Sequence, residues 1–408
     1  MGIAPLEGIT VVSVESWVAV PGASAALADM GARVIKVEQP GGDPLRNIGR
    51  PVKLEGKARH YDYHYDVDNR GKQSVAIAID RPAGRELVHA LAAKADIFMC
   101  NLLVDRQQRF GLDPETLLAI NPRLVHSTFT GYGTEGPDAW RPGFDVTAFF
   151  GRSGLYDAMR DGEDGIVPQA RPAQGDHASS LAIIGSILAA LRVAERTGEG
   201  QVVESSLYST AVWTQASDYA ITAVDRAPVR PRARHEMILP TANRYPCGDG
   251  KWVVLNMPKE SAWPKLCKTI GLDHLLDDER FADLKGRYRN MAEIVAAIDE
   301  ALSAKSRDEW GVLFDAAGLI WGPVMGMHEV ASDPQADAME LFPTIDHPDI
   351  GPYRTVGIPM RFRDADVRPR GPAAATGEHT REVLTDLGVE AERIDGLLAD
   401  GTVVEPKG

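Results

Sequence analysis

Hydrophobic and polar positions in the first third of the chain alternate between two patterns. Short runs rich in β-branched and apolar residues predict strands at residues 9–14, 33–38, 74–79, 96–100 and 124–129. Between them, residues 23–30 and the stretch from Pro82 through Leu91 have helical spacing, with the proline at a helix start. Strands alternating with helices predict a parallel sheet covered on both faces, so we expect an α/β, Rossmann-like fold.

A longer apolar pattern follows. From Leu181 the apolar residues recur at Ile184, Ile187 and Leu191, the spacing of a helix that buries one face. The sequence A-Q-G-D-H places Asp176 where this helix begins. An aspartate there is typical of an N-cap, and the helix dipole favours its ionised form. An ionised carboxylate preceded by glycine also suits a nucleophile, and the five residues alone leave both interpretations open.

The rest of the chain shows two interruptions. Residues 151–174 are rich in Gly, Asp and Arg without periodicity, which predicts a long loop leading to Asp176. Residues 226–240 contain Pro228 and Pro231 and read as a linker, followed by a hairpin signal around residues 247–250. We expect a large domain over residues 1–225, a small domain over residues 226–329 and a return to the large domain over residues 330–408.

Composition narrows the function classes. The 408 residues are 44% hydrophobic and 25% charged, which is typical of a globular protein, and the length favours two domains. A net charge of −14 argues against a general nucleic-acid surface. Three widely spaced cysteines, without a C-x-x-C pair, predict neither disulfides nor a metal site. We expect a soluble cytoplasmic protein that does not enter a membrane, because no leader pattern or long uninterrupted apolar run is present.

Ligands of parallel sheets bind beyond the carboxyl ends of the strands. In this chain those positions are residues 16–19, 39–46, 101–103 and 130–133. Neither G-x-G-x-x-G nor a P-loop motif follows any predicted strand, so dinucleotide and P-loop nucleotide binding lose their main sequence support.

Several collinear motifs carry a resemblance to a known family. They are P-L-E-G-I-T-V-V at 5–12, A-D-M-G-A-R-V-I-K-V-E at 28–38, N-R-G-K-Q-S-V at 69–75, A-D-I-F-M-C-N at 95–101, G-D at 175–176, R-T-G-E-G-Q at 196–201, G-P-V at 322–324 and G-E-H-T at 377–380. Together they resemble the class III CoA-transferases, the CaiB/BaiF-like family that includes formyl-CoA transferase and α-methylacyl-CoA racemase. The resemblance implies a Rossmann-like large domain built from both chain ends, a small inserted domain and an interlocked homodimer.

The resemblance also implies a chemistry. The aspartate that matches Asp176 attacks an acyl-CoA thioester, giving an aspartyl-acyl anhydride and then an aspartyl-CoA thioester, from which CoA passes to a carboxylic acid. The implied substrates are acyl-CoA and a carboxylate, with no metal and no tightly bound cofactor. By this resemblance Val18, Ala19, Ile77, Asn101 and Leu102 line CoA, Arg109 contacts CoA, and Tyr132 lies in an active-site loop. An acidic protein must supply a local basic site for the CoA phosphates, and the nearby candidates for it are Arg46, Lys72 and Arg106.

Two departures from the family pattern narrow the function. Phe144 stands in the G-F-D-V stretch where the racemase branch has a histidine, and phenylalanine cannot transfer a proton. Residues 241–258 lack the glycine run of the formyl-CoA transferase branch. CoA transfer is therefore the leading hypothesis; a 2-methylacyl-CoA racemase, with His177 or His126 as a substitute base, and a non-catalytic acyl-CoA binding protein remain as alternatives.

Overall fold

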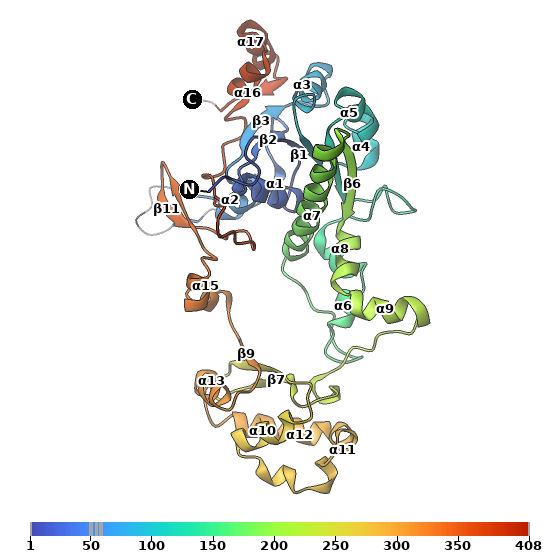
Figure 1. Cartoon of the computed structure of the whole chain (residues 1–408), viewed down its shortest axis with the longest axis vertical. Helices are drawn as coiled ribbons and strands as arrows, with labels where there is room; N and C mark the ends of the chain where they lie inside the picture. Colours follow the sequence, from blue (N-terminus) through green and yellow to red (C-terminus); the bar gives the residue numbers. More distant parts are fainter. Residues whose placement is uncertain (1, 49–51, 54–55, 57–59, 407–408) are drawn as a thin grey trace. The chain divides into compact units, whose positions relative to one another are not determined.

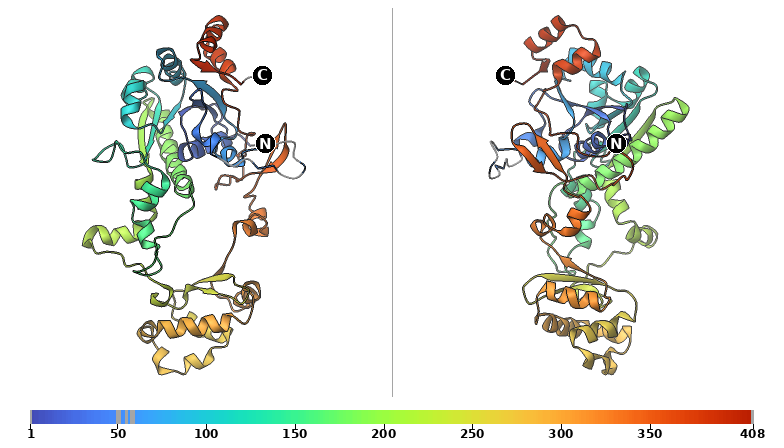
Figure 2. Two further views of the ribbon diagram at one scale, coloured as in Figure 1. Left: turned by 180° about the vertical axis from the view of Figure 1, so that it is seen from behind. Right: turned by 60° about the vertical axis from the view of Figure 1, so that its left-hand side comes forward.

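The computed structural model describes residues 2–48, 52–53, 56 and 60–406. The chain divides into two compact units. Unit 1 contains Met1–Leu155, Ala170–Tyr219 and Asp337–Gly408, and unit 2 contains Tyr156–Gln169 and Ala220–Ala336. Unit 1 thus holds both ends of the chain, which Figure 2 shows from two sides.

Unit 1 is built on a seven-stranded sheet with the order β12-β3-β2-β1-β4-β5-β6. Its strands are β1 (Thr10–Val14), β2 (Arg33–Glu38), β3 (Gln73–Ile77), β4 (Ile97–Cys100), β5 (Val125–Thr130), β6 (Gln201–Ser206) and β12 (Val403–Val404). All neighbours are parallel except β12, which runs antiparallel to β3. The order reverses between β1 and β4, as in a Rossmann sheet, and this confirms the predicted fold class.

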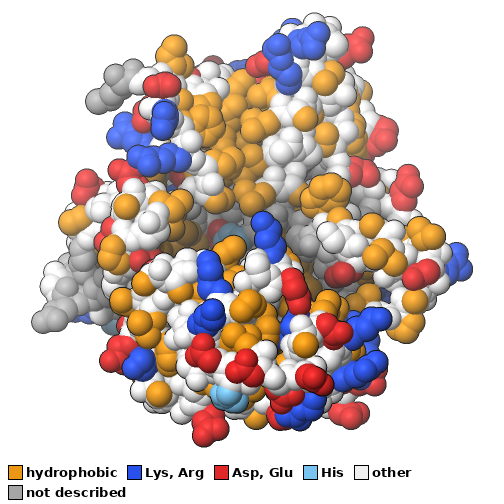
Figure 3. Space-filling view, turned by 60° about the horizontal axis from the view of Figure 1, so that its bottom comes forward, with side chains coloured by type: hydrophobic (Ala, Val, Ile, Leu, Met, Phe, Trp, Pro, Cys, Tyr) orange, Lys and Arg blue, Asp and Glu red, His pale blue; other side chains and the backbone are white. Residues whose placement is uncertain are grey.

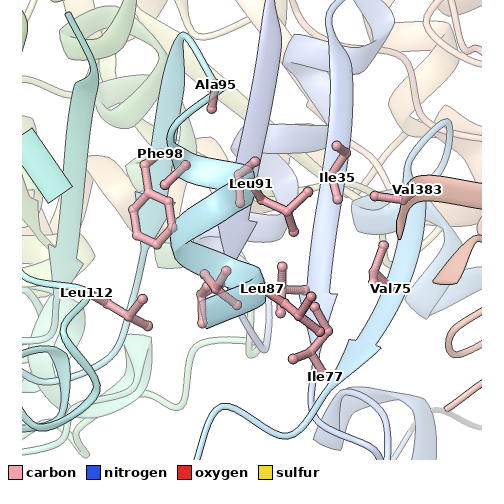
Figure 4. Close-up of a cluster of buried hydrophobic side chains, with 14 of the residues drawn as sticks. Ile35, Val75, Ile77, Leu87, Leu91, Ala95, Phe98, Leu112 and Val383 are labelled. Carbon is pink, nitrogen blue, oxygen red and sulfur yellow. The ribbon is translucent and has the colours of Figure 1, made fainter. Parts of the chain in front are cut away.

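Successive side chains of a strand point to opposite faces of the sheet, and helices cover both faces. Val12 and Val14 of β1 pack into an apolar cluster with α3 (Pro82–Ala92), where Leu87 and Leu91 lie one turn apart (Figure 4). The neighbouring Ser13 points the other way, toward Glu15 and α1 (Ala19–Asp29). Each fully buried aliphatic side chain in the cluster contributes about 1.5–3 kcal/mol, so this cluster is a main source of the unit's stability.

The C-terminal segment completes the same cluster. The helix α16 (Thr380–Leu387) lies beside β3, and α17 (Ala391–Ala399) lies beside α16 and β12; both are red in Figure 1. They contribute Val383, Leu384, Ile394 and Leu397 to the core. The remaining elements of unit 1 are η1 (Pro44–Asn47), α2 (Tyr63–Asn69), α4 (Val104–Phe110), α5 (Pro114–Ile120), η2 (Asp145–Gly151), α7 (Gln174–Thr197), α8 (Leu207–Thr214), β10 (Thr344–His347) and β11 (Gly351–Arg354). Three helices cross the boundaries between the units: α6 (Leu155–Ala158), α9 (Ala216–Asp225) and α15 (Pro334–Ala338).

One described helix, α7, is long and apolar enough to cross a membrane. Such a helix is weak evidence for a membrane span, because core helices of soluble proteins have the same length and composition. Within unit 1, α7 packs against α1, β5 and β6. Its apolar residues Ile183, Ile184 and Ile187 are buried, as expected of a core helix.

Unit 2 is a small α+β unit. An antiparallel sheet joins β7 (Ala242–Pro246), β8 (Trp252–Asn256) and β9 (Trp321–Val324), and the β7–β8 hairpin turns at the predicted residues 247–250. Ser306 is the N-cap of α13 (Arg307–Ala316) and forms a capping box with Glu309. In it, the side chain of each residue accepts a hydrogen bond from the backbone N–H of the other. The other elements are η3 (Arg234–Glu236), α10 (Ala262–Ile270), η4 (Asp273–Leu276), η5 (Glu279–Phe281), α11 (Leu284–Arg289), α12 (Met291–Leu302), α13 (Arg307–Ala316) and α14 (Met327–Val330).

Charged side chains are mixed on the surface. Figure 3 shows basic side chains interspersed with acidic and hydrophobic ones on one face of the molecule. The three cysteines, Cys100, Cys247 and Cys267, are buried and free. Among the described residues, no group of three or more His, Cys, Asp or Glu side chains is placed to hold a metal ion.

Candidate active site

A cavity of about 590 Å³ opens beyond the carboxyl ends of β1, β2, β3 and β4. It lies at the switch in strand order, where ligands of open α/β sheets bind. The Asn101 side chain fixes this point, because its amide donates to the Ser16 carbonyl at 2.7 Å and accepts from the Ser16 N–H at 3.2 Å. The chain after β1 is thereby tied to the chain after β4.

Part of the cavity wall is a buried network of charges. Three carboxylates that line the cavity each pair with a buried or partly buried cation. The pairs are Lys36–Asp43 at 2.6 Å, Arg46–Glu38 at 2.7 Å and Lys72–Glu15 at 2.7 Å. Hydrogen bonds from Arg46 and Ser74, with the nearby Lys36 charge, outweigh burial and hold the pKa of Glu38 at about 2. The network therefore places three neutralised carboxylates beside the cavity.

Of the predicted CoA-contacting residues, four line this cavity. They are Ile77, Asn101, Leu102 and Arg106. Arg106 is exposed on α4 and forms no ion pair with the described part of the chain, so its charge is available to a phosphate. In contrast, the charges of Arg46 and Lys72 are already paired with Glu38 and Glu15.

The other predicted residues do not line this cavity. Val18 and Ala19 form the start of α1, where Val18 packs against Ala173 and the Ala19 carbonyl accepts from Ser180 Oγ at 2.7 Å. They therefore lie against the first turns of α7. Arg109 is exposed at the end of α4 beside Phe110, and Tyr132 packs under Arg141; neither lines the cavity.

The start of α7 differs from the sequence prediction. The helix begins at Gln174, after an N-cap Ala173 in the left-handed conformation with φ of 75°, so Asp176 is the third helical residue and not the cap. The capping carboxylate comes from a distant segment, because Asp145 Oδ2 accepts from the Gly175 N–H at 3.3 Å. The prediction was wrong because the pattern within α7 cannot reveal a cap supplied by η2.

Gly175 is required by the close approach of η2. A Cβ atom at this position would lie 2.7 Å from Cγ of Phe149 and 3.0 Å from Cβ of Asp145. Both distances are shorter than side chains tolerate without a shift of the neighbouring segment. The glycine therefore lets η2, a turn of π-helix of the kind frequent at functional sites, pack directly on the first turn of α7.

The surroundings of Asp176 favour its protonated form. Burial and the nearby Asp145 carboxylate raise its pKa to about 7, with a smaller contribution from Asp68, while His177 acts in the opposite direction. The sequence predicted an ionised carboxylate stabilised by the helix dipole. Here burial and the neighbouring carboxylates outweigh the helix, so Asp176 titrates near neutral pH.

His177, the next residue, is bound to Asp68. Its Nε2 atom lies 2.9 Å from Asp68 Oδ1. The Asp68 side chain comes from α2 and is only 2% exposed. Sequence reasoning did not select Asp68 or Asp145 as site residues, since each lies far from the G-D motif in the chain. Their only sequence signal is that Asp68 directly precedes the N-R-G-K-Q-S motif and Asp145 directly follows Phe144.

An aromatic pair connects the cavity wall to the segment that carries Asp145. The rings of Trp17 and Phe144 meet edge to face, with centroids 5.1 Å apart. Trp17 lines the cavity and holds a φ of 70°, an uncommon value for a residue with a side chain. Phe144 directly precedes Asp145 and is 50% exposed, so the pair offers an apolar surface near Asp176.

Comparison with known proteins identifies the family. The family model described as CoA-transferase family III matches residues 6–380, nearly the whole chain. The chain belongs to CoA-transferase family III. The transferase is 32% identical to (R)-2-hydroxy-4-methylpentanoate CoA-transferase of Clostridioides difficile, over 96% of this chain and 98% of the relative. It is also 29% identical to cinnamoyl-CoA:phenyllactate CoA-transferase of Clostridium sporogenes, over 98% of each chain.

Solved structures agree with this family. A CaiB/BaiF family protein from Brucella suis matches the transferase with a TM-score of 0.82 at 29% identity, covering 95% of this chain and all of that one. Rv3272 from M. tuberculosis matches with a TM-score of 0.80 at 28% identity, covering 93% of this chain and 99% of that one. The predicted family and enzyme class are confirmed, and an enzyme of this class takes CoA thioesters and carboxylic acids as substrates. The transferase is therefore not a silent binding protein.

Proposed function

We propose that this CoA-transferase works through covalent intermediates on Asp176. The observation that carries the proposal is the place of this carboxylate. It lies in the first turn of α7, partly buried and next to Asp145, with its pKa raised to about 7. A carboxylate of raised pKa is a stronger nucleophile than an exposed one, and about half of it is ionised at neutral pH.

The proposed reaction proceeds in exchanges that balance without water. One Asp176 oxygen attacks the thioester carbonyl of the donor, the C–S bond breaks, and CoA leaves as its thiolate with an acyl-aspartyl anhydride formed. The thiolate then attacks the Asp176 carbonyl carbon, releases the donor acid as its carboxylate and leaves an aspartyl-CoA thioester. The acceptor carboxylate repeats the two exchanges in reverse, so that Asp176 is regenerated and acceptor acyl-CoA departs.

The cavity beyond β1 to β4 is the proposed CoA site. It has an available cation in Arg106, and its three lining carboxylates are neutralised by Lys36, Arg46 and Lys72. The phosphates of CoA require such a local site on an acidic protein. The apolar edge of Trp17 and Phe144 is the proposed contact for the acyl chain.

The acceptor is a carboxylic acid, and an assay with a panel of acids would identify it. Two relatives are named for 2-hydroxy acids with a branched or an aromatic side chain. The half-exposed Phe144 ring suits such side chains, because it offers apolar surface. We therefore propose these acids as the first acceptors to assay, with dicarboxylates as the comparison set.

The mechanism is tested by trapping the intermediate. The protein is incubated with an acyl-CoA, treated with hydroxylamine or borohydride, digested and analysed by peptide mass spectrometry. We expect the modification on Asp176, and we expect Asp176→Ala to abolish both the label and transfer while CoA still binds. Full turnover with Asp176 unmodified would exclude this mechanism.

A racemase remains the second candidate, and the structure disfavours it. Phe144 occupies the position of the expected base. Of the two substitutes, His126 is fully buried on β5, where Nε2 lies 3.0 Å from the Leu112 carbonyl oxygen, and Nε2 of His177 is bound to Asp68 at 2.9 Å. Burial also lowers the pKa of His126. Deuterium exchange at the α-carbon of a 2-methylacyl-CoA in heavy water would support racemisation, and its absence would remove this candidate.

We also propose a homodimer, interlocked as the family resemblance implies, and a cytoplasmic location. Apolar side chains on α7, β6 and α8 are exposed in the single chain: Leu181, Val193, Val202 and Trp213, the last 78% exposed. Exposed apolar surface of this kind supports a protein–protein contact.

The proposed cytoplasmic location is supported by the three cysteines, which are free and buried, as suits a reducing compartment. Light scattering of the purified protein tests the dimer, and fractionation of cells tests the location.

A further inference from the structure

The contact between His177 and Asp68 lies beside the proposed nucleophile but takes no part in the exchanges described above. It joins α7 to α2 where both helices pack on α1. Gly22 of α1 makes room for it, since a Cβ atom there would lie 3.2 Å from Asp68 Oδ1 and 2.9 Å from Ser180 Oγ. The contact is therefore built into the closest approach of three helices.

The surroundings of the His177 ring favour its charged form. Nε2 faces the Asp68 carboxylate at 2.9 Å, and this carboxylate is 2% exposed. The imidazolium carries an N–H on both ring nitrogens and so always donates to Asp68, whereas a neutral imidazole does so in only one of its two tautomers. The Asp68 hydrogen bond raises the pKa of His177 accordingly.

Three charged side chains are the main ones that act on Asp176. Asp145 from η2 and Asp68 from α2 oppose its ionisation, and His177 favours it. The only charged residue of α1, Asp29, is paired with Arg70 at 2.7 Å. Asp68 is bound to His177, so the charge of the histidine also compensates that of Asp68. Among these three side chains, His177 is the cation.

We propose that His177, held in place by Asp68, is a positioning residue whose positive charge favours the ionised form of Asp176 against the Asp145 carboxylate and thereby sets the lowest pH at which the transferase works. This inference rests on the proposed role of Asp176 as nucleophile. The charge of His177 partly offsets that of the neighbouring Asp145 carboxylate, which remains the larger of the two influences on Asp176. Asp68 acts through His177 and does not need to touch the substrate.

The test compares two substitutions of His177 that differ in charge. His177→Gln keeps a hydrogen-bond donor for Asp68 and removes the charge, while His177→Lys keeps a positive charge. We measure kcat/KM for CoA transfer across the pH range in which Asp176 titrates. For His177→Gln we expect the decrease of kcat/KM at low pH to begin at a higher pH than in the wild-type protein. Near pH 6 its kcat/KM should be reduced about three- to tenfold, and at high pH it should approach the wild-type value. His177→Lys should restore the low-pH activity.

The controls separate folding, mechanism and charge. Exposed His274 in unit 2 provides a matched variant, His274→Asn, whose pH profile should not move. Thermal unfolding verifies that each variant is folded. A uniform loss in His177→Gln at every pH, or failure of His177→Lys to restore activity, would overturn the proposal and leave His177 a structural link. Absence of acyl label on Asp176 in the unchanged, active protein would instead overturn the proposed mechanism, and this inference with it.

Discussion

Asp145 Oδ2 lies 3.3 Å from the backbone nitrogen of Gly175, so one carboxylate caps the helix that carries another. This contact satisfies a helix N–H that lacks a partner within α7. It also brings a negative charge to Asp176 and is, after burial, the largest cause of the raised pKa of that residue. A structural cap and the reactivity of the proposed nucleophile are therefore linked through one side chain.

The first prediction concerns this link. Asp145→Asn retains an oxygen that accepts from Gly175 N–H but removes the charge, so the pKa of Asp176 should decrease from about 7. In a pH profile of kcat/KM, the fall at low pH should then begin at a lower pH, the direction opposite to that of His177→Gln. Exposed Asp157→Asn serves as the control with an unmoved profile. This account would be contradicted if the low-pH decrease of kcat/KM in Asp145→Asn began at the wild-type pH or at a higher pH.

The second prediction links the same group to stability. Because the pKa of Asp176 is raised in the folded protein, the folded state binds the proton more tightly than the unfolded state. The resulting stabilisation is complete below 3.8, the ordinary pKa of an aspartate, and is lost as the pH rises through about 7. Asp176→Asn should therefore be more stable than the unchanged protein at alkaline pH, by up to about 4 kcal/mol, and of similar stability near pH 4. Thermal unfolding at both pH values measures it; equal differences at both would refute it.

The third prediction concerns CoA binding. Arg106 lines the cavity and forms no ion pair with the described residues, so Arg106→Gln should raise KM for acyl-CoA several-fold with a smaller effect on kcat. The wild-type KM should rise with added salt, and the variant should be less sensitive. Exposed Arg109, which lies on the same helix but does not line the cavity, offers the matched variant Arg109→Gln. An equal effect of both substitutions would argue against a specific contact.

The fourth prediction distinguishes a structural from a ligand-binding role for Lys72. Its Nζ lies 2.7 Å from Glu15 Oε1, and both side chains are buried. Lys72→Met leaves Glu15 as a buried charge without its cation, and should lower the free energy of unfolding by about 3–5 kcal/mol. The double variant Lys72→Met/Glu15→Gln should regain part of this loss in urea unfolding. A large rise in KM for acyl-CoA at unchanged stability would instead show that Lys72 binds the substrate.

Much of the fold was predictable from periodicity. The runs at residues 33–38 and 9–14 correspond to β2 and β1 within one residue, since buried parallel strands are continuous apolar runs. The start of α7 was not predictable, because the residues from Gln174 to Ser180 lack an apolar stripe and the cap comes from Asp145, distant in sequence. Strand β12, only two residues long, carries no pattern of its own.

The site was predictable only where one motif contains the chemistry. Asp176 was selected from its own motif and its resemblance to a family position. The raised pKa of Asp176 could not be predicted from the sequence. It depends on Asp145 and Asp68, which approach Asp176 through tertiary packing around Gly22 and Gly175. For Arg46 and Lys72, charge alone suggested phosphate binding, and only the structure reveals the acidic partners Glu38 and Glu15.

The buried ion pairs beneath the cavity give it a wall whose charges cancel. Without Lys36, Arg46 and Lys72, three uncompensated carboxylates would line the cavity that we propose for the phosphate-bearing CoA. Because the paired charges cancel, the attraction for a negatively charged ligand comes from the exposed edge of the cavity, where Arg106 lies. A substitution at that edge therefore changes one unpaired charge, whereas a substitution of one partner in a pair leaves the other partner as a buried charge without compensation.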